Sequence, residues 1–237
     1  MPDGQFRTTH WSVVMAAQDD DSTGASRAME VLCRAYWYPL YAFVRRRGYD
    51  TEDAQDLTQE FFFRVLQRDF LRHVAREKGK FRTFLLASVN NFLVSEWHRG
   101  QAAKRGGGQR IFSLDEMQAE ERYANEPAAP GTPEQLYDQK WALTAIEQAM
   151  DELQSEFRAS GKPEHFNRFK PFLSTRGDDA EYEKAGAPLG LNAGAFAVAV
   201  HRFRRRYAQV LRNVVAQTVS GPDQIEEELR FLAQALQ

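Results

Sequence analysis

The chain has 237 residues, with 31 Lys and Arg against 33 Asp and Glu, so its formal net charge is only −2. This length suits one large domain or two small ones. Cys33 is the only cysteine, which excludes an internal disulfide and a zinc site built from several cysteines, and fits a cytoplasmic location. No apolar run could span a bilayer and no secretory signal follows Met1, so we expect no membrane insertion.

Charge is distributed unevenly along the chain. Residues 76–110 contain eight Arg and Lys with two acids, and residues 201–212 contain five Arg with none. Between them, residues 113–160 contain eleven Asp and Glu with three Arg and Lys. Scattered charge usually belongs to solvated helix faces, but the scarcity of acids inside both basic segments favours contact with nucleic acid.

Apolar residues recur at helical spacing along most of the chain, and no segment shows sustained strand alternation, so we predict an all-α fold. A first helix is expected over residues 25–47, with Pro39 favouring a kink. Asp50 or Thr51 caps a second helix over residues 52–66, whose first turn is acidic.

A third helix is expected over residues 81–99, with apolar residues every three or four positions. The segment 106–133 follows, with a triple glycine, several prolines and many acids, but without strong periodicity. We therefore predict an acidic linker there, between an N-terminal helical domain at 1–105 and a second helical domain at 134–218. A short amphipathic helix occupies the last segment, 219–237.

Residues 180–206 carry a helix-turn-helix pattern. Gly186 is small where two helices would cross closely, and Gly190 accepts a positive φ in the turn. Asn192 caps the second helix, which presents Phe196 inward. The side chains expected on its outward face are Arg202, Arg204, Arg205 and Arg206. The alternative is an ordinary pair of short helices joined by a glycine turn.

The acidic face of the second helix has two interpretations. Asp53, Asp56, Gln59 and Glu60 fall mostly off the apolar side, where they could meet a protein partner or form a carboxylate site. A metal or acid–base site needs converging carboxylates or histidines, whereas the five histidines are scattered and no nucleophile–base arrangement is evident. We therefore expect no metal, no cofactor and no enzymatic activity.

The third helix combines aromatic rings with amides and cations. Trp97 can stack on an unpaired base, while Asn90 and Asn91 can bond to base edges and Arg99 supplies charge nearby. This composition favours contact with single-stranded nucleic acid. The alternative, burial in a core, applies to most of the phenylalanines of this helix.

Three segments in this order resemble a bacterial RNA polymerase sigma factor of the extracytoplasmic-function type in the sigma-70 superfamily. The sequence DAQDLTQEFF at 53–62 resembles the clamp-binding segment of region 2. The stretch that begins FRTFL at residue 81 and continues to Arg99 resembles the segment of region 2 that melts and reads the −10 element. Residues 182–207, which contain AVAVHRFRRR, resemble the helix-turn-helix of region 4.

The resemblance implies core RNA polymerase and promoter DNA as partners, with an anti-sigma factor as a further candidate. It implies polymerase binding by Asp53, Asp56, Gln59, Glu60 and Phe63. It implies −10 DNA binding by Lys80, Arg82, Asn90, Asn91, Trp97, Arg99, Lys104 and Arg105. In the helix-turn-helix it implies −35 DNA binding by Asn192, Ala193, Ala197, His201, Arg202, Arg204 and Arg205.

On this resemblance we expect a promoter-specificity subunit that binds core polymerase, recognises −10 and −35 DNA and enables transcription initiation. The chain departs from the family pattern at residues 184–188, which include Pro188, and at Ala197, where Lys is common. These departures favour a second hypothesis, a degenerate sigma-like interaction protein that binds polymerase or a regulator without reading a promoter.

Overall fold

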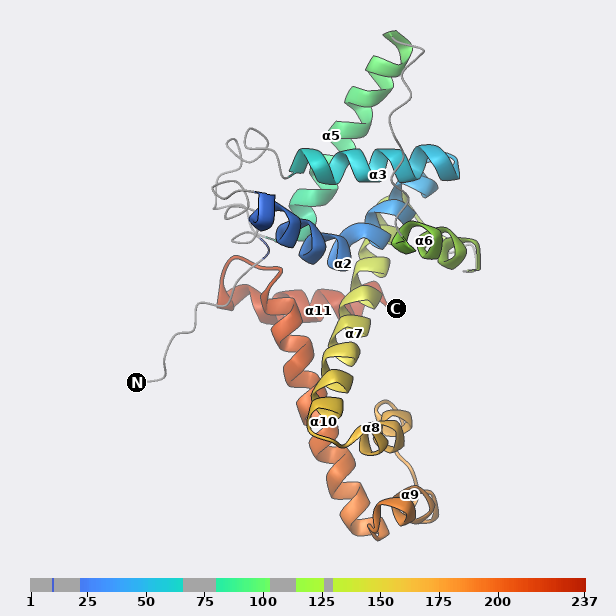
Figure 1. The fold of residues 1–237 in the computed structure, drawn as a ribbon, viewed down its shortest axis with the longest axis vertical. Helices are drawn as coiled ribbons and strands as arrows, with labels where there is room; N and C mark the ends of the chain where they lie inside the picture. Colours follow the sequence, from blue (N-terminus) through green and yellow to red (C-terminus); the bar gives the residue numbers. More distant parts are fainter. Residues whose placement is uncertain (1–9, 11–21, 66–79, 103–113, 126–129) are drawn as a thin grey trace. The chain divides into compact units, whose positions relative to one another are not determined.

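Figure 1 shows the chain as a computed structural model, which describes residue 10 and residues 22–65, 80–102, 114–125 and 130–237. Every regular element in these ranges is a helix, which confirms the all-α prediction. The chain divides by compactness into two units. Unit 1 contains the described residues up to Thr144 together with residues 215–237, and unit 2 contains residues 145–214.

Unit 1 is built around three helices, α2 (Ser22–Arg46), α3 (Thr51–Val65) and α5 (Phe81–Ala102). Helix α2 continues through Pro39 and packs against both α3 and α5 (Figure 1). The apolar residues that recur every three or four positions form a buried stripe on α5, and a similar buried stripe runs along α2. The fully buried members of the two stripes are Leu32, Tyr36, Leu40, Phe81, Leu85 and Val89.

Asp50 begins α3 as its N-cap. The Asp50 Oδ1 atom accepts a hydrogen bond from the Asp53 N–H at 2.8 Å, and the Asp50 carbonyl accepts one from the Ala54 N–H at 3.0 Å. Of the two caps considered from the sequence, Asp50 is therefore the one used, because its carboxylate satisfies a backbone donor that the first turn leaves unpaired.

Helix α6 (Leu114–Asn125) lies in the stretch that we expected to be a linker. It is held by contacts with α2. The Glu120 carboxylate accepts hydrogen bonds from the Tyr41 hydroxyl and from Arg45, whose Nε lies 3.1 Å away. Arg45 also lies over the Tyr123 ring, 5.1 Å from its centroid. The sequence did not indicate a helix within the predicted linker, because these contacts are tertiary and leave little apolar periodicity.

Helix α7 (Pro133–Ala159) begins in unit 1 and continues into unit 2. Within unit 1 its buried aromatic residues are Tyr137 and Trp141, whereas Leu136 and Leu143 are only half-buried. The two large rings therefore define the face of α7 that packs into the core of unit 1.

The C-terminal segment returns to unit 1. After α10 (Ala193–Ala216), the Thr218 carbonyl accepts the N–H of Phe81 at 3.0 Å, and the Gln217 carbonyl accepts the N–H of His10 at 2.8 Å. A short 3-10 turn, η3 (Pro222–Gln224), leads into α11 (Ile225–Ala235). The helix expected after residue 219 thus forms, and it is part of unit 1.

Unit 2 holds the rest of α7 and α10, with α8 (Pro163–Phe169), η1 (Lys170–Phe172), α9 (Asp179–Gly186) and η2 (Ala187–Leu189) between them. Its core is aromatic. The Phe169 and Phe196 rings have centroids 5.3 Å apart, and Phe203 lies 5.8 Å from Phe166. Such ring pairs contribute stability beyond their buried area.

The turn between α9 and α10 has the geometry that the sequence predicts. A Cβ atom on Gly186 would lie 2.6 Å from the Leu191 carbonyl oxygen, so only glycine fits there. Gly190 has a φ of 69°. The Asn192 Oδ1 atom accepts the N–H of Ala195 at 2.9 Å and caps α10. Helix α9 ends before Pro188, because proline has no N–H to donate to the helix. The chain continues there as the 3-10 turn η2.

None of the helices in the described ranges is both long and apolar enough to cross a membrane.

Candidate functional site

The outer face of α3 brings together the side chains expected to bind a protein partner. Asp53, Asp56 and Glu60 are exposed, Gln59 is half-buried, and 53% of Phe63 is exposed. Residues three or four apart share one face of a helix, so Asp56, Gln59, Glu60 and Phe63 form a continuous surface. We call this surface the α3 face.

The α3 face is strongly acidic at its N-terminal end. Burial, followed by the neighbouring carboxylates of Asp50, Asp56 and Glu52, raises the pKa of Asp53. Clustered like charges repel one another, so a basic partner surface would relieve the repulsion. The face is therefore suited to a cationic protein surface with an apolar pocket for Phe63.

Arg64, which the sequence analysis did not single out, connects the α3 face to α5. Its Nε lies 2.9 Å from Glu60 Oε1, and its Nη2 lies 2.8 Å from Glu96 Oε1. The guanidinium also covers the Phe92 ring at 4.7 Å from its centroid. The spacing of Glu60 and Arg64 by four positions was the available sequence signal.

The C-terminal half of α5 exposes apolar and amide side chains. Trp97 is 56% exposed and Val94, one turn earlier, is 54% exposed. Asn91 is also exposed, one turn before Val94. Trp97 is thus no core residue, and its ring contacts His98 edge-on with centroids 5.0 Å apart. These residues form what we call the α5 tip, which offers a ring face for stacking and an amide for a base edge.

Asn90 differs from Asn91 because its amide is engaged within unit 1. Its Oδ1 atom accepts a hydrogen bond from Arg47, and its Nδ2 donates to the Leu86 carbonyl at 3.1 Å. Nucleic-acid binding by Asn90 stays a prediction, and it would require Arg47 to move.

Lys80 and Arg82 also lie apart from the α5 tip. Arg82 lies in the first turn of α5 and Lys80 just precedes the helix. The distance along a helix from Arg82 to Val94 is about 18 Å. Arg82 is buried, with Nε 2.5 Å from Glu228 Oε1 and Nη1 2.7 Å from Asp138 Oδ1. Lys80 Nζ lies 2.8 Å from Glu227 Oε1. We expected both cations to face DNA, but in this structure carboxylates from α7 and α11 pair with them.

The other residues of this basic segment that were predicted to bind DNA are Arg99, Lys104 and Arg105. Lys104 and Arg105 lie outside the described residues. Arg99 is part of α5, but its side chain also lies outside what the structure describes. Their expected binding to −10 DNA stays a prediction.

The helix-turn-helix exposes a smaller cationic surface than expected. His201, Arg202 and Arg205 are exposed on α10, and Ala197 lies one turn before His201. Ala193 and Asn192 stand at the start of the helix, where the Asn192 side chain is used as the cap and the Ala193 N–H donates to Glu183 Oε2 at 2.8 Å. Direct base reading by these first residues would therefore be limited.

Two of the arginines expected to point outward from α10 make contacts within unit 2. The Arg204 guanidinium donates to the carbonyls of Phe172 and Thr175 at 2.7 Å each, and the residue is half-buried. Arg206 forms an ion pair with Glu156, at 2.5 Å. The outward orientation predicted for Arg204 is wrong, because its guanidinium donates to the Phe172 and Thr175 carbonyls within unit 2.

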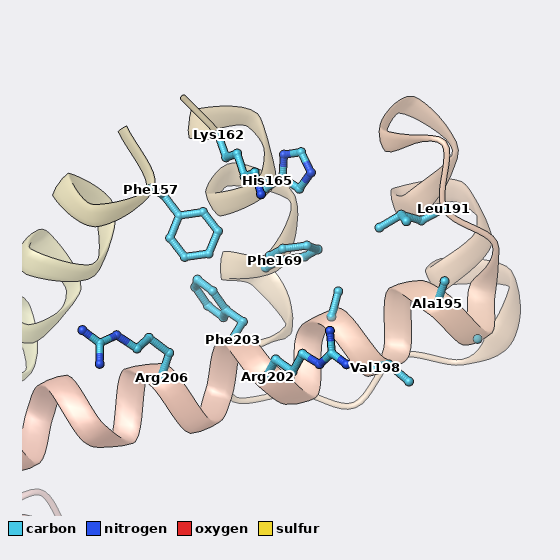
Figure 2. A pocket seen from close by; sticks show the side chains of 12 residues that line it. Phe157, Lys162, His165, Phe169, Leu191, Ala195, Val198, Arg202, Phe203 and Arg206 are labelled. Carbon is cyan, nitrogen blue, oxygen red and sulfur yellow. The ribbon is translucent and has the colours of Figure 1, made fainter. Parts of the chain in front are cut away.

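A groove of about 660 Å³ runs beside α10 in unit 2 (Figure 2). The rings of Phe157, Phe169 and Phe203 form its apolar floor, and Lys162 and Arg202 lie at its edge. Of the residues predicted to bind DNA, Arg202 lines this groove. Ala197, His201 and Arg205 are spaced four residues apart and lie on a neighbouring stripe of the helix surface.

Among the described residues, no three His, Cys, Asp or Glu side chains cluster as metal ligands would.

Comparison with known proteins agrees with this geometry. Residues 32–103, which include most of α2, α3 and α5, match the family described as sigma-70 region 2. Over 205 residues the chain is 28% identical to the ECF RNA polymerase sigma factor SigE of Mycolicibacterium smegmatis, covering 85% of this chain and 69% of that protein. No solved structure matches the chain. Residues 32–103 are thus similar to sigma-70 region 2, and the chain as a whole is similar to an RNA polymerase sigma factor of the extracytoplasmic-function type.

Proposed function

We propose that the chain is a promoter-specificity subunit of RNA polymerase that uses three surfaces for three contacts. The α3 face binds core polymerase, the α5 tip holds the melted strand of the −10 element, and the exposed side of α10 binds upstream duplex. The chain catalyses nothing itself, and it acts in the cytoplasm, where polymerase and promoter DNA meet.

The observation that carries this proposal is the exposure of Trp97 on the helix that matches region 2. An exposed indole buries little apolar area within its own chain, whereas stacking on an unpaired base is worth about 1–3 kcal/mol. Arg64 links this helix to α3 through Glu96 and Glu60, so the two surfaces are held together within unit 1.

The experiment that tests the proposal is run-off transcription with core polymerase of the source organism and a library of its genomic fragments. Addition of the purified chain should yield transcripts that start at a defined set of sites, all sharing a −10 motif. Core polymerase alone provides the baseline. If the chain binds polymerase but no start site depends on it, promoter recognition is excluded.

A second function, a sigma-like interaction protein that binds polymerase without reading a promoter, is favoured by specific contacts. Lys80 and Arg82 are paired with carboxylates, and Arg204 is bonded to carbonyls. The first turn of α10 offers almost only alanine and glycine to DNA. The same transcription experiment separates the two functions, because only a promoter-specificity subunit yields discrete start sites.

A further inference from the structure

The acidic first turn of α11 contacts two cations at the N-terminal end of α5, Lys80 just before the helix and Arg82 in its first turn. Lys80 Nζ lies 2.8 Å from Glu227 Oε1 and 3.0 Å from Glu228 Oε2, while Arg82 Nε lies 2.5 Å from Glu228 Oε1. Burial alone would lower the pKa of Lys80, but its hydrogen bonds to Glu227 and Glu228 raise that pKa above its usual value. Lys80 is therefore charged, and both Lys80 and Arg82 are bound by carboxylates of the same chain.

Aromatic rings hold this contact in place. The Arg82 guanidinium carbon lies 3.6 Å from the centroid of the Phe231 ring on α11 and 5.1 Å from that of Trp141 on α7. The Asp138 carboxylate binds the other side of the guanidinium at 2.7 Å. Since Glu228 is completely buried, the pair of Arg82 and Glu228 serves as the anchor of α11.

Lys80 and Glu227 form the accessible edge of the same contact. The Glu227 side chain is 64% exposed, and that of Lys80 is 17% exposed. An ammonium group binds carboxylate and phosphate oxygens in the same way, as a charged donor. The Glu227 carboxylate therefore occupies the position on Lys80 that a phosphate approaching from solvent would take.

We propose that α11 is an intramolecular competitor of nucleic acid: the Glu227 carboxylate occupies the Lys80 ammonium, and a DNA phosphate binds Lys80 only when Glu227 leaves it. The Arg82–Glu228 anchor keeps α11 attached during this exchange, so that the block is reversible. The proposal rests on the proposed function, because it assumes that unit 1 binds promoter DNA.

The test compares the wild-type chain with Glu227→Gln, each assembled with core polymerase and a fluorescent fork-shaped promoter DNA whose −10 strand is unpaired. The variant should bind the DNA roughly two- to fivefold more tightly, the range expected for release of one ion pair at the protein surface. The slope of log affinity against log salt should steepen by about 0.7, since one more phosphate of a single strand is contacted.

Two matched variants assign the effect to Lys80. Glu226→Gln removes the same charge from the same helical turn and should leave affinity and salt slope at the wild-type values. Lys80→Gln should change the affinity of the wild-type chain little, but it should abolish the gain in the Glu227→Gln background. Urea unfolding of each variant checks that α11 stays docked.

The outcomes distinguish this proposal from the proposed function. If polymerase with the wild-type chain binds the fork DNA and Glu227→Gln behaves as Glu226→Gln does, competition at Lys80 is overturned. A gain that persists after Lys80→Gln also overturns it. If every chain binds polymerase but none recruits the fork DNA, the proposed function fails, and the competition fails with it.

Discussion

Arg82 and Glu228 stand 146 residues apart in the chain, yet their side chains form an ion pair with Nε and Oε1 2.5 Å apart. Both side chains are buried, and Glu228 has no exposed surface. The pair joins the first turn of α5 to the first turn of α11, and it explains how residues 215–237 become part of unit 1.

Glu228→Ala should lower the free energy of unfolding by about 3–5 kcal/mol, because a buried ion pair that loses one partner leaves a charge without compensation. Urea denaturation followed by circular dichroism measures the change. The double variant Arg82→Met with Glu228→Leu should lose less than Glu228→Ala alone, since the fully buried charge of the pair is then removed with its partner, and Asp138, which also binds Arg82, has 24% of its side chain exposed to solvent. A loss under about 1 kcal/mol for Glu228→Ala would show that the pair is not an anchor.

Asp56→Arg should weaken binding to core polymerase at least tenfold, because it places a cation at the centre of the acidic α3 face, against a basic partner surface. Pull-down with titrated polymerase measures the affinity. Glu121→Arg, the same charge reversal on the exposed side of α6, is the control and should bind as the wild type does. Equal binding by both variants would contradict the assignment of the α3 face.

Trp97→Ala should reduce open-complex formation roughly 5- to 150-fold, the range that corresponds to loss of stacking on one base. Permanganate reactivity of thymines in the −10 region reports the melted fraction. Trp97→Phe keeps a ring face and should restore much of the activity. Because the side chain is 56% exposed, polymerase binding and thermal stability should not change. Identical permanganate patterns for wild type and Trp97→Ala would remove Trp97 from the proposed DNA contact.

Arg205 and Arg204 should respond differently to substitution by alanine. Arg205 is exposed, so its loss should lower the salt slope for duplex DNA by about 0.9 with little change in stability. Arg204 donates to the Phe172 and Thr175 carbonyls, so its loss should mainly destabilise unit 2. Binding of the full chain to duplex DNA at several salt concentrations, with thermal melts, tests both. A salt slope that Arg205→Ala leaves unchanged would exclude a phosphate contact.

Acid should destabilise unit 1 through His10. Burial lowers the pKa of His10 to about 4 from its usual 6.5, and its Nδ1 lies 3.0 Å from the Tyr36 hydroxyl. Between these two values the unfolded chain binds a proton that the folded chain does not, so stability falls as pH decreases from 6.5 towards 4. The loss from this residue reaches about 3 kcal/mol.

Urea unfolding at a series of pH values measures this dependence, and His10→Gln supplies the reference. The glutamine variant cannot take up the proton, so its stability should fall less steeply than that of the wild type between pH 6.5 and 4. Parallel curves for the two proteins would show that His10 is not the group responsible.

The local features of the fold were predictable because neighbouring residues determine them. The stripe from Phe81 to Val89 follows from helical spacing, and the cap at Asn192 follows from an amide just before a helix. Gly186 and Gly190 were predicted from the close crossing and the positive φ that the turn requires, and the structure confirms both. The acidic side of α3 is likewise exposed as its spacing predicts.

Tertiary structure alone decided which charged groups remain at the surface. The sequence by itself determined that residues 76–110 and 201–212 are basic, that the fold is helical, and that α3 has an acidic side. It did not determine that Glu228 would reach Arg82, that Arg204 would turn to the Phe172 carbonyl, or that Glu120 would fix α6 to Tyr41. Spacing and caps act within a few residues, whereas these contacts depend on which helices meet, and pairing of distant residues leaves no period in the chain.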